Sequence, residues 1–177
     1  MSFAASNVQA DAIITTVPDW NGSSAVSAFG YGASATATYG ETITATDANK
    51  VLTSFTFEMK MPATTTFRGY VYGWNGSMAT EQKFASSSDR HTILDNTSFE
   101  PSTFSTGGIE LTPGLSYVLF ASTTGTDPGG IGQGIWGQTQ MASSYAGGEF
   151  VFINNTNMDQ LTNSQWTKGH LGPGADL

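Results

Sequence analysis

The chain contains no cysteine, which excludes disulfide bridges, thiolate zinc sites and cysteine nucleophiles. It also has few charged side chains: they make up 11% of the 177 residues, whereas a typical globular domain has about 25%. Lys and Arg number 6 and Asp and Glu number 14, so the formal net charge is −8. The shortage of cations argues against nucleic acid as a partner and against a polybasic membrane-surface module, because both depend on clustered Lys and Arg.

Long hydrophobic runs are missing as well, since no stretch reaches the roughly 18 apolar residues of a membrane helix. We therefore expect no membrane span in this chain. Hydrophobic residues nevertheless make up 38% and aromatic residues 12%, which is enough to build a core. Ser, Thr, Asn and Gly take the place of the missing charges. The branched Cβ of Thr favours strands, and Glu and Lys, which favour helices, are scarce, so the composition predicts an all-β protein.

Strand patterns recur along the chain. Six segments are apolar at alternate positions or throughout, and turn residues separate them: 38–45, 51–59, 67–74, 111–123, 131–138 and 149–153. Asn75-Gly76 predicts a tight turn, and residues 158–161 are typical of a single helical turn. The sequence therefore predicts a two-sheet antiparallel β-sandwich of jelly-roll type with very little helix, formed by residues 11–177 as a single domain.

Alternation also predicts which side chains lie in the core. In segment 51–59 the large apolar residues share one face: Val51, Phe55, Phe57 and Met59. Such a strand is half-buried, and its apolar face is expected to point inward. Segment 149–153 is apolar on both faces, so we expect a strand that is covered on both sides.

The two ends of the sequence carry weaker patterns. Residues 1–10 are expected to be either the remnant of a signal peptide or a flexible N-terminus. Val8-Gln9-Ala10 before Asp11 has the small-residue spacing of a signal-peptidase site, but no basic segment and no apolar stretch precedes it. At the other end, Leu177 is an apolar residue directly after a turn-forming stretch, so we expect a further strand or tail to follow it.

The order of the strand landmarks is itself informative: 37–45, 51–57, 67–74, 111–120, 150–155 and Gln165-Trp166. In this order the chain resembles the extracellular β-sandwich domains of bacterial PEP-CTERM (exosortase-sorted) and choice-of-anchor proteins. The resemblance implies secretion or display at the cell surface, in the cell envelope or an exopolysaccharide matrix, and it brings no catalytic residues. Members of this family usually continue with a final strand, a Pro-Glu-Pro motif, a membrane helix and a basic tail, and this sequence contains none of these.

A row of rings provides the candidate binding site. Tyr70, Tyr72 and Trp74 alternate along one strand, which places them on one face at a spacing of roughly 7 Å. Flat rings stack on the apolar C–H faces of sugars, so the row predicts a carbohydrate-binding surface, with Trp136 as a second wall. The alternative is that the rings are core, which holds if the opposite face, with Gly69 and Gly73, points outward.

Motifs of catalysis are absent from the sequence. It has two histidines, His91 and His170, and no phosphate loop, nucleophile elbow or His-Glu-x-x-His motif. Asp89-Arg90-His91, beside a run of serines, is interpreted as a solvated loop rather than part of a catalytic triad. The five glutamates considered as a glycosidase pair lie on different segments: Glu58, Glu81, Glu100, Glu110 and Glu149. Alternation places Glu58 and Glu110 toward solvent, so we expect no enzyme and assign no catalytic residue.

Calcium is the one metal that the sequence leaves open. Oxygen ligands are available at 47–49, at Asp127 and at 154–159. Asx turns explain the same residues, and the spacing does not match an EF-hand, so we assign no metal ligand and no cofactor.

The sequence thus favours a non-catalytic, secreted or cell-surface structural or interaction protein associated with an extracellular matrix or exopolysaccharide. Its expected partners are polysaccharide or copies of itself, and self-association is expected through an unpaired edge strand. The alternative is a lectin-like carbohydrate-binding module. A more distant alternative is a surface protein that decorates a phage or capsid, because such sandwiches also have Thr- and Gly-rich surfaces.

Overall fold

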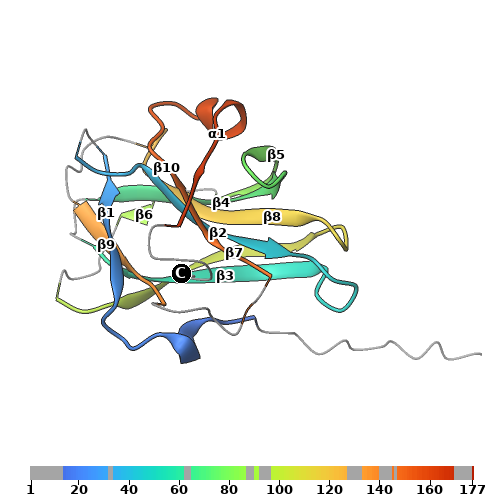
Figure 1. Ribbon diagram of the computed structural model, residues 1–177, viewed down its shortest axis with the longest axis horizontal. Helices are drawn as coiled ribbons and strands as arrows, with labels where there is room; N and C mark the ends of the chain where they lie inside the picture. The colour runs from blue at the N-terminus through green and yellow to red at the C-terminus, as the bar shows by residue number, and fades with distance from the viewer. Residues whose placement is uncertain are drawn as a thin grey trace, which may run out of the picture.

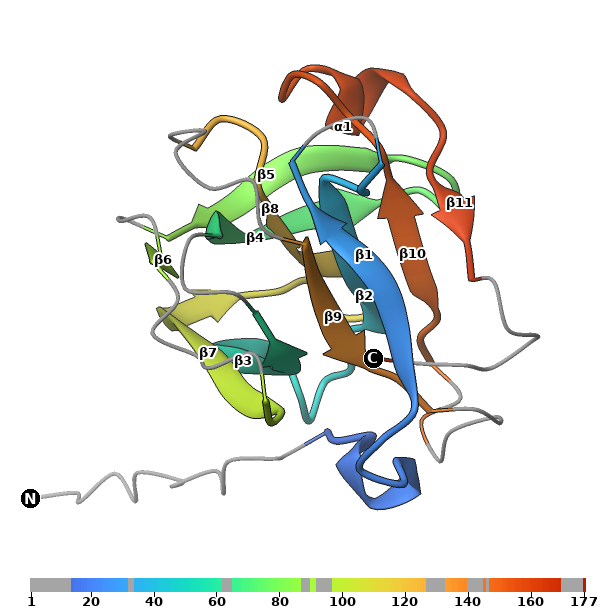
Figure 2. The same cartoon turned by 90° about the vertical axis from the view of Figure 1, so that its left-hand side faces the viewer.

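The computed structural model describes residues 14–31, 34–61, 65–86, 90–91, 97–126, 133–139, 145, 147–169 and 177, with no side-chain description at 90–91. Within these residues, two antiparallel sheets pack face to face as a sandwich (Figures 1 and 2). The predicted all-β sandwich is confirmed, whereas its jelly-roll connectivity stays a prediction. The described helices are the 3₁₀ turn η1 (Val17–Asp19) and the single turn α1 (Gln160–Asn163), which overlaps the helical turn expected at 158–161.

The strands are distributed unequally between the two sheets. The small sheet has the order β1 (Ala25–Gly30), β9 (Gln133–Gly137), β3 (Val51–Lys60), β7 (Glu100–Glu110). The large sheet has the order β11 (Thr167–Lys168), β10 (Phe150–Ile153), β2 (Thr38–Thr44), β8 (Ser116–Ser122), β4 (Thr66–Trp74), β5 (Ala79–Ala85), and β6 (Arg90–His91) also pairs with β4. Most neighbouring strands are distant in sequence.

The hairpin between β4 and β5 confirms the turn expected at Asn75-Gly76. The Asn75 Oδ1 atom accepts hydrogen bonds from the backbone N–H groups of Ser77 (3.0 Å) and Met78 (2.9 Å). Gly76 has a φ of +99°, a conformation that side-chain-bearing residues rarely adopt. The local sequence therefore favours this turn, and the backbone N–H of Trp166 also donates to the Ser77 carbonyl at 2.8 Å.

Each of the six expected strands is present, and five of the described strands were missed: β1, β5, β6, β7 and β11. Of these, β1, β5, β7 and β11 lie at sheet edges, and β6 and β11 are only two residues long. Strand β5 is polar at four successive positions, and β7 contains a proline and two glycines, so neither shows a clear alternation in sequence. Edge strands are covered less by neighbouring strands than central ones are. Their alternation of apolar and polar residues is therefore weaker, and strand prediction depends on this alternation.

The main core lies between the sheets and consists largely of aromatic rings. Phe29, Phe67, Trp136 and Phe150 are completely buried there. The rings of Phe55, on β3, and Phe104, on β7, stack at 5.0 Å between centroids. Phe57 and Met59 point into the same core, as their alternation predicts.

Val51 does not follow that alternation. It was expected inside with Phe55, but it is exposed. The pairing of β3 with β7 shifts register between Leu52 and Ser54, and Leu52 packs against the core instead. An irregularity of this kind reverses the faces of the residues beyond it, which explains the position of Val51.

A second core covers the outer side of the large sheet. The segment 153–166, which includes α1, lies on this side, opposite to the small sheet (Figure 1). Strand β4 is therefore buried on both faces, because Phe67 and Val71 point into the main core while Tyr70 and Tyr72 point into the outer one. Strand β10, expected to be covered on both sides, is likewise divided between the two cores.

Candidate functional sites

The ring row predicted on β4 lies inside the outer core. Tyr70 is 5% exposed and Tyr72 is 7% exposed, and both rings pack on Phe120. Trp74 is half-buried, with its ring 5.7 Å from that of Trp166. Faces that are covered in this way are not available to a sugar, so the rings are core. The condition given for this alternative is not met, however, because the face of β4 with Gly69 points into the main core and not outward.

Trp136 is completely buried in the main core, away from the ring row. Its ring lies 5.0 Å from Phe29, 5.6 Å from Tyr39 and 4.6 Å from Phe57, measured between centroids. It therefore contributes to packing between the sheets and does not form a wall beside Trp74.

Exposed hydroxyl groups line the outer side of the small sheet. On β3 and β7, the buried residues Phe55, Phe57 and Phe104 alternate with outward-pointing polar ones. These outward residues form a surface that we call the hydroxyl face: Ser54, Thr56, Thr103 and Ser105. Ser54 lies opposite Ser105, and Thr56 lies opposite Thr103 with their Oγ1 atoms hydrogen-bonded at 2.7 Å. The four residues thus form two cross-strand pairs whose side chains are exposed on one side of the small sheet.

Two rings, Trp20 and Phe99, lie at one end of the same side. Their centroids are 5.0 Å apart in an edge-to-face arrangement, and both residues are half-buried. Trp20 lies on Gly137 of β9, where an added Cβ would be 2.9 Å from Cζ2 of the indole. The Trp20 Nε1–H donates a hydrogen bond to the Ser24 carbonyl at 2.7 Å, which fixes the indole. Neither ring belongs to a strand, so the period-two pattern gave no sign of this ring pair.

Glu58 connects the ring pair with the hydroxyl face. It follows the buried Phe57, and its Cβ lies close to the outward side of Gly137, beneath Trp20. Burial raises the pKa of its carboxyl group, and the negative charge of Glu100 raises it further. Lys60, two residues along, has its Nζ 5.9 Å from the centre of the Phe99 ring. The surface thus combines two rings and four hydroxyl groups with the carboxyl groups of Glu58 and Glu100 and the ammonium group of Lys60.

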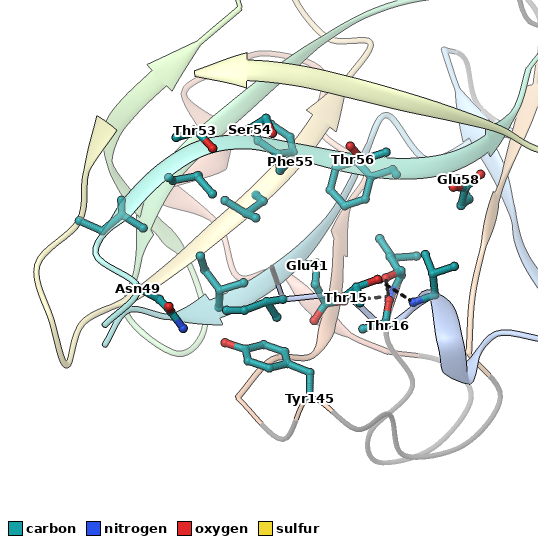
Figure 3. A pocket seen from close by; sticks show the side chains of 18 of the residues that line it. Thr15, Thr16, Glu41, Asn49, Thr53, Ser54, Phe55, Thr56, Glu58 and Tyr145 are labelled. Carbon is teal, nitrogen blue, oxygen red and sulfur yellow. Dashed lines mark hydrogen bonds between the residues drawn. The ribbon is translucent and has the colours of Figure 1, made fainter. Parts of the chain in front are cut away.

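A cleft of about 500 Å³ opens between the two sheets, and its lining includes Ser54, Thr56 and Glu58 of the surface described above. Its walls are mostly apolar, and the large residues among them are Ile43, Val51, Leu52, Phe55, Phe57, Leu111 and Leu119. Figure 3 shows Glu41 with Thr15 and Thr16 at one end and Asn49 at the other. Its volume is in the range of small-molecule pockets.

Glu41 is the residue of this cleft that the sequence analysis overlooked. It lies between Tyr39 and Ile43 on the inner face of β2 and is 6% exposed. The sequence did contain a sign of it, because a charged residue at a core-facing position of an alternating strand is rare without a partner. Gly148 lets the neighbouring loop approach closely, since an added Cβ there would be 2.6 Å from Glu41 Oε1.

Leu177 lies in this cleft and is bound by both its backbone groups. Its N–H donates to Glu41 Oε2 at 3.1 Å, and its carbonyl accepts a hydrogen bond from the Thr16 hydroxyl at 2.5 Å. Its side chain packs against the main core. The cleft therefore already holds one leucine in the way that a peptide-binding site holds an anchor residue.

The other titratable residues do not assemble into a catalytic or metal-binding group where the structure describes them. Glu81 pairs with Lys83 at 2.6 Å and Glu149 with Lys168 at 2.5 Å, on opposite edges of the large sheet. No three His, Asp or Glu side chains gather closely enough within the described ranges to hold a metal ion. Asp89, Asp127, His170, the side chain of His91 and residues 1–10 lie outside the description. The described helices include none that is long and apolar enough to cross a membrane.

Comparison of the chain with protein-family models, curated proteins and solved structures finds no match. The resemblance to exosortase-sorted surface domains therefore stays an expectation.

Proposed function

We propose that this chain is a non-catalytic interaction domain of a bacterial surface or extracellular matrix, and that it contacts polysaccharide through the outer side of its small sheet. The observation that supports this proposal is the position of the Trp20–Phe99 ring pair on the same side of the small sheet as the hydroxyl face. Secretion and surface location rest on the resemblance and on the composition of the sequence.

The chemistry of this surface suits a neutral glycan. Sugars present apolar C–H faces, which pack on aromatic rings, and hydroxyl groups, which exchange hydrogen bonds with hydroxyl and carboxyl groups. The ring pair supplies the first kind of contact, and Thr56, Thr103 and Glu58 supply the second. A neutral polymer carries no charge, so the net charge of −8 on the chain does not oppose its approach.

The alternative function is a lectin-like module that recognises one glycan. It is favoured by the compact group of Trp20, Phe99 and Glu58, which resembles a single sugar subsite more than an extended contact surface. The two functions differ in selectivity, because a lectin binds one oligosaccharide on a glycan array, whereas a matrix component is retained by several polysaccharides without a preferred one.

The test compares variants of this surface with an exposed ring elsewhere. We expect Phe99→Ala and Trp20→Ala to lose most of their retention on polysaccharide gels in affinity electrophoresis. Tyr31→Ala, which removes an exposed ring outside the surface, serves as the matched control and should be retained like the wild type. Thermal melting of each variant checks that the fold is intact. Unchanged retention of a folded Phe99→Ala variant would contradict the proposal.

A further inference from the structure

One edge of β3 is largely without a partner strand inside the small sheet. On its β7 side, β3 is paired from Val51 to Met59. On its other side, pairing with β9 is confined to Met59 and Lys60. Among the strands that the structure describes, none pairs with residues 51–58 on this second side, although β3 is not an outer strand of the sheet. The backbone N–H and C=O groups of such an edge can pair with a further strand.

The interlayer cleft runs along this open edge. Its lining contains every residue of the segment 51–58, so the cleft borders both faces of β3 and the edge between them. In Figure 3, β3 lies along one side of the cleft, and Glu41 and Tyr145 lie across from it. Ile43 of β2 and Leu119 of β8 line the cleft from the large sheet and give it an apolar floor. An extended chain placed here would continue the small sheet and pack its inward side chains on the large one.

The open edge of β3 lacks the features that protect two of the outer edges. Strand β7 carries Pro101 in its second position, and β5 carries the charged pair Glu81 and Lys83. Prolines and charges on an edge oppose pairing with a further strand. The segment 51–57 contains neither. The edge of β3 is therefore better suited to strand pairing than β5 or β7.

Leu177 occupies the far side of the cleft and leaves the edge of β3 accessible. Its N–H donates to Glu41 Oε2 at 3.1 Å, and its carbonyl accepts a hydrogen bond from the Thr16 hydroxyl at 2.5 Å. Neither of these two hydrogen bonds involves the backbone of β3. The cleft measures about 500 Å³ with Leu177 among its lining residues, so a further chain can contact β3 while Leu177 stays in place.

The charge of the cleft distinguishes between possible peptides. Its described lining includes two carboxyl residues, Glu41 and Glu58, and neither Lys, Arg nor His. The whole chain has a net charge of −8. A peptide that carries Lys is therefore attracted, and one that carries Glu is repelled. The same net charge opposes the approach of a second copy of this chain, so the occupant favoured by charge is a different, basic polypeptide.

We propose that the cleft is a strand-addition site, which binds an extended, Lys-containing peptide with apolar residues at alternate positions as a new strand beside β3. Backbone hydrogen bonds to residues 51–58 provide the affinity, and the apolar floor selects the inward side chains. Ser54, Thr56 and Glu58 border both this cleft and the proposed glycan surface. The peptide site is nevertheless defined by the backbone edge of β3, and it does not depend on glycan binding.

The first test compares short synthetic peptides by fluorescence anisotropy. In the first peptide, Val alternates with Thr and a Lys stands at each end. The second peptide has the same side chains, but every backbone nitrogen between the two lysines is methylated, so it cannot donate hydrogen bonds to β3. We expect it to bind about tenfold more weakly or worse. A third peptide, with Glu in place of both lysines, should bind about fivefold more weakly than the first. No binding of the first peptide, or equal binding of the first two, would overturn the proposal.

The second test locates the bound peptide on the protein by hydrogen–deuterium exchange. The first peptide should slow the exchange of backbone N–H groups in the segment 51–58 and leave those of β5 unchanged. Protection that appears only outside 51–58 would show that the peptide binds elsewhere and would contradict strand addition to β3.

A charge placed in the cleft provides a third test. Val51→Lys puts a cation on a cleft residue that is 55% exposed, and it should weaken binding of the Lys-containing peptide about two- to fivefold. Leu115→Lys is the matched control, because Leu115 is 54% exposed and does not line the cleft. Equal affinities of the two variants would count against the site. The peptide assays contain no polysaccharide, so their failure is separable from failure of the glycan proposal.

Discussion

The ring of Phe104 occupies the place where a side chain on Gly69 would have to lie. An added Cβ on Gly69 would be 2.2 Å from Cδ1 of Phe104. Gly69 belongs to β4 of the large sheet and Phe104 to β7 of the small sheet, so the glycine allows a ring of one sheet to rest on the backbone of the other. The glycine-containing face of β4 therefore points into the main core and not toward solvent.

Gly69→Ala is expected to destabilise the protein by about 1–3 kcal/mol, because the added methyl group must displace a buried ring in a close-packed core. Urea denaturation measures the change. Gly169→Ala is the matched control, since the nearest atom to an added Cβ there lies at an ordinary 3.6 Å. A Gly69→Ala variant as stable as Gly169→Ala would contradict this account of the packing between the sheets.

Trp166→Ala is expected to lower the free energy of unfolding by about 3–5 kcal/mol, which is the usual range when a buried tryptophan is replaced by alanine. The indole is buried in the outer core, its Nε1–H donates to the Leu161 carbonyl at 2.9 Å, and its ring meets that of Phe120 at 5.3 Å. Trp74→Ala should destabilise less, because Trp74 is half-buried. Thermal denaturation ranks the two variants, and the reverse order would show that segment 153–166 contributes little to stability.

Asn155→Ala is expected to lower the free energy of unfolding by about 1–3 kcal/mol, because buried polar groups would lose their hydrogen-bond partner. The buried Asn155 accepts a hydrogen bond from the Thr38 hydroxyl at 2.6 Å and donates one to the Asn157 carbonyl at 3.0 Å. Its neighbour Asn154 is exposed, so Asn154→Ala should change stability by no more than about 0.5 kcal/mol. Equal free energies of unfolding for the two variants would contradict a structural role for Asn155.

Glu58 is expected to make stability fall as the pH rises above 4.5. Burial and Glu100 raise the pKa of its carboxyl group from 4.5 in the folded protein, so the folded state keeps a proton that the unfolded state has already released. Glu58→Gln should therefore gain stability relative to the wild type between pH 4.5 and pH 7. Denaturation at several pH values measures this difference, and Glu100→Gln should make it smaller. A difference independent of pH would show that the pKa of Glu58 is not raised.

Much of the fold could be predicted because strands and turns leave local patterns. The alternation in Val51–Lys60 correctly placed Phe55, Phe57 and Met59 in the core, and Asn75-Gly76 correctly placed a hairpin. Val51 was misplaced, because the irregularity beside Leu52 depends on pairing with β7 and has no sign in β3 itself. The candidate sites were mostly missed, since Trp20 and Phe99 come from loops without a period.

The sequence by itself determined the strand content of this protein and the two-residue period that separates the faces of each strand, because both arise from backbone geometry and neighbouring side chains. Only the tertiary structure decided what covers each face. Tyr70 and Tyr72 are buried in a cluster with Phe120 and Trp166, and Trp166 comes more than 90 residues later in the chain. Glu41 lies in a cleft because Thr16 and Leu177 meet it there. The alternation of apolar and polar residues shows that a strand has two different faces. Which of these faces is exposed to solvent is decided by long-range packing alone.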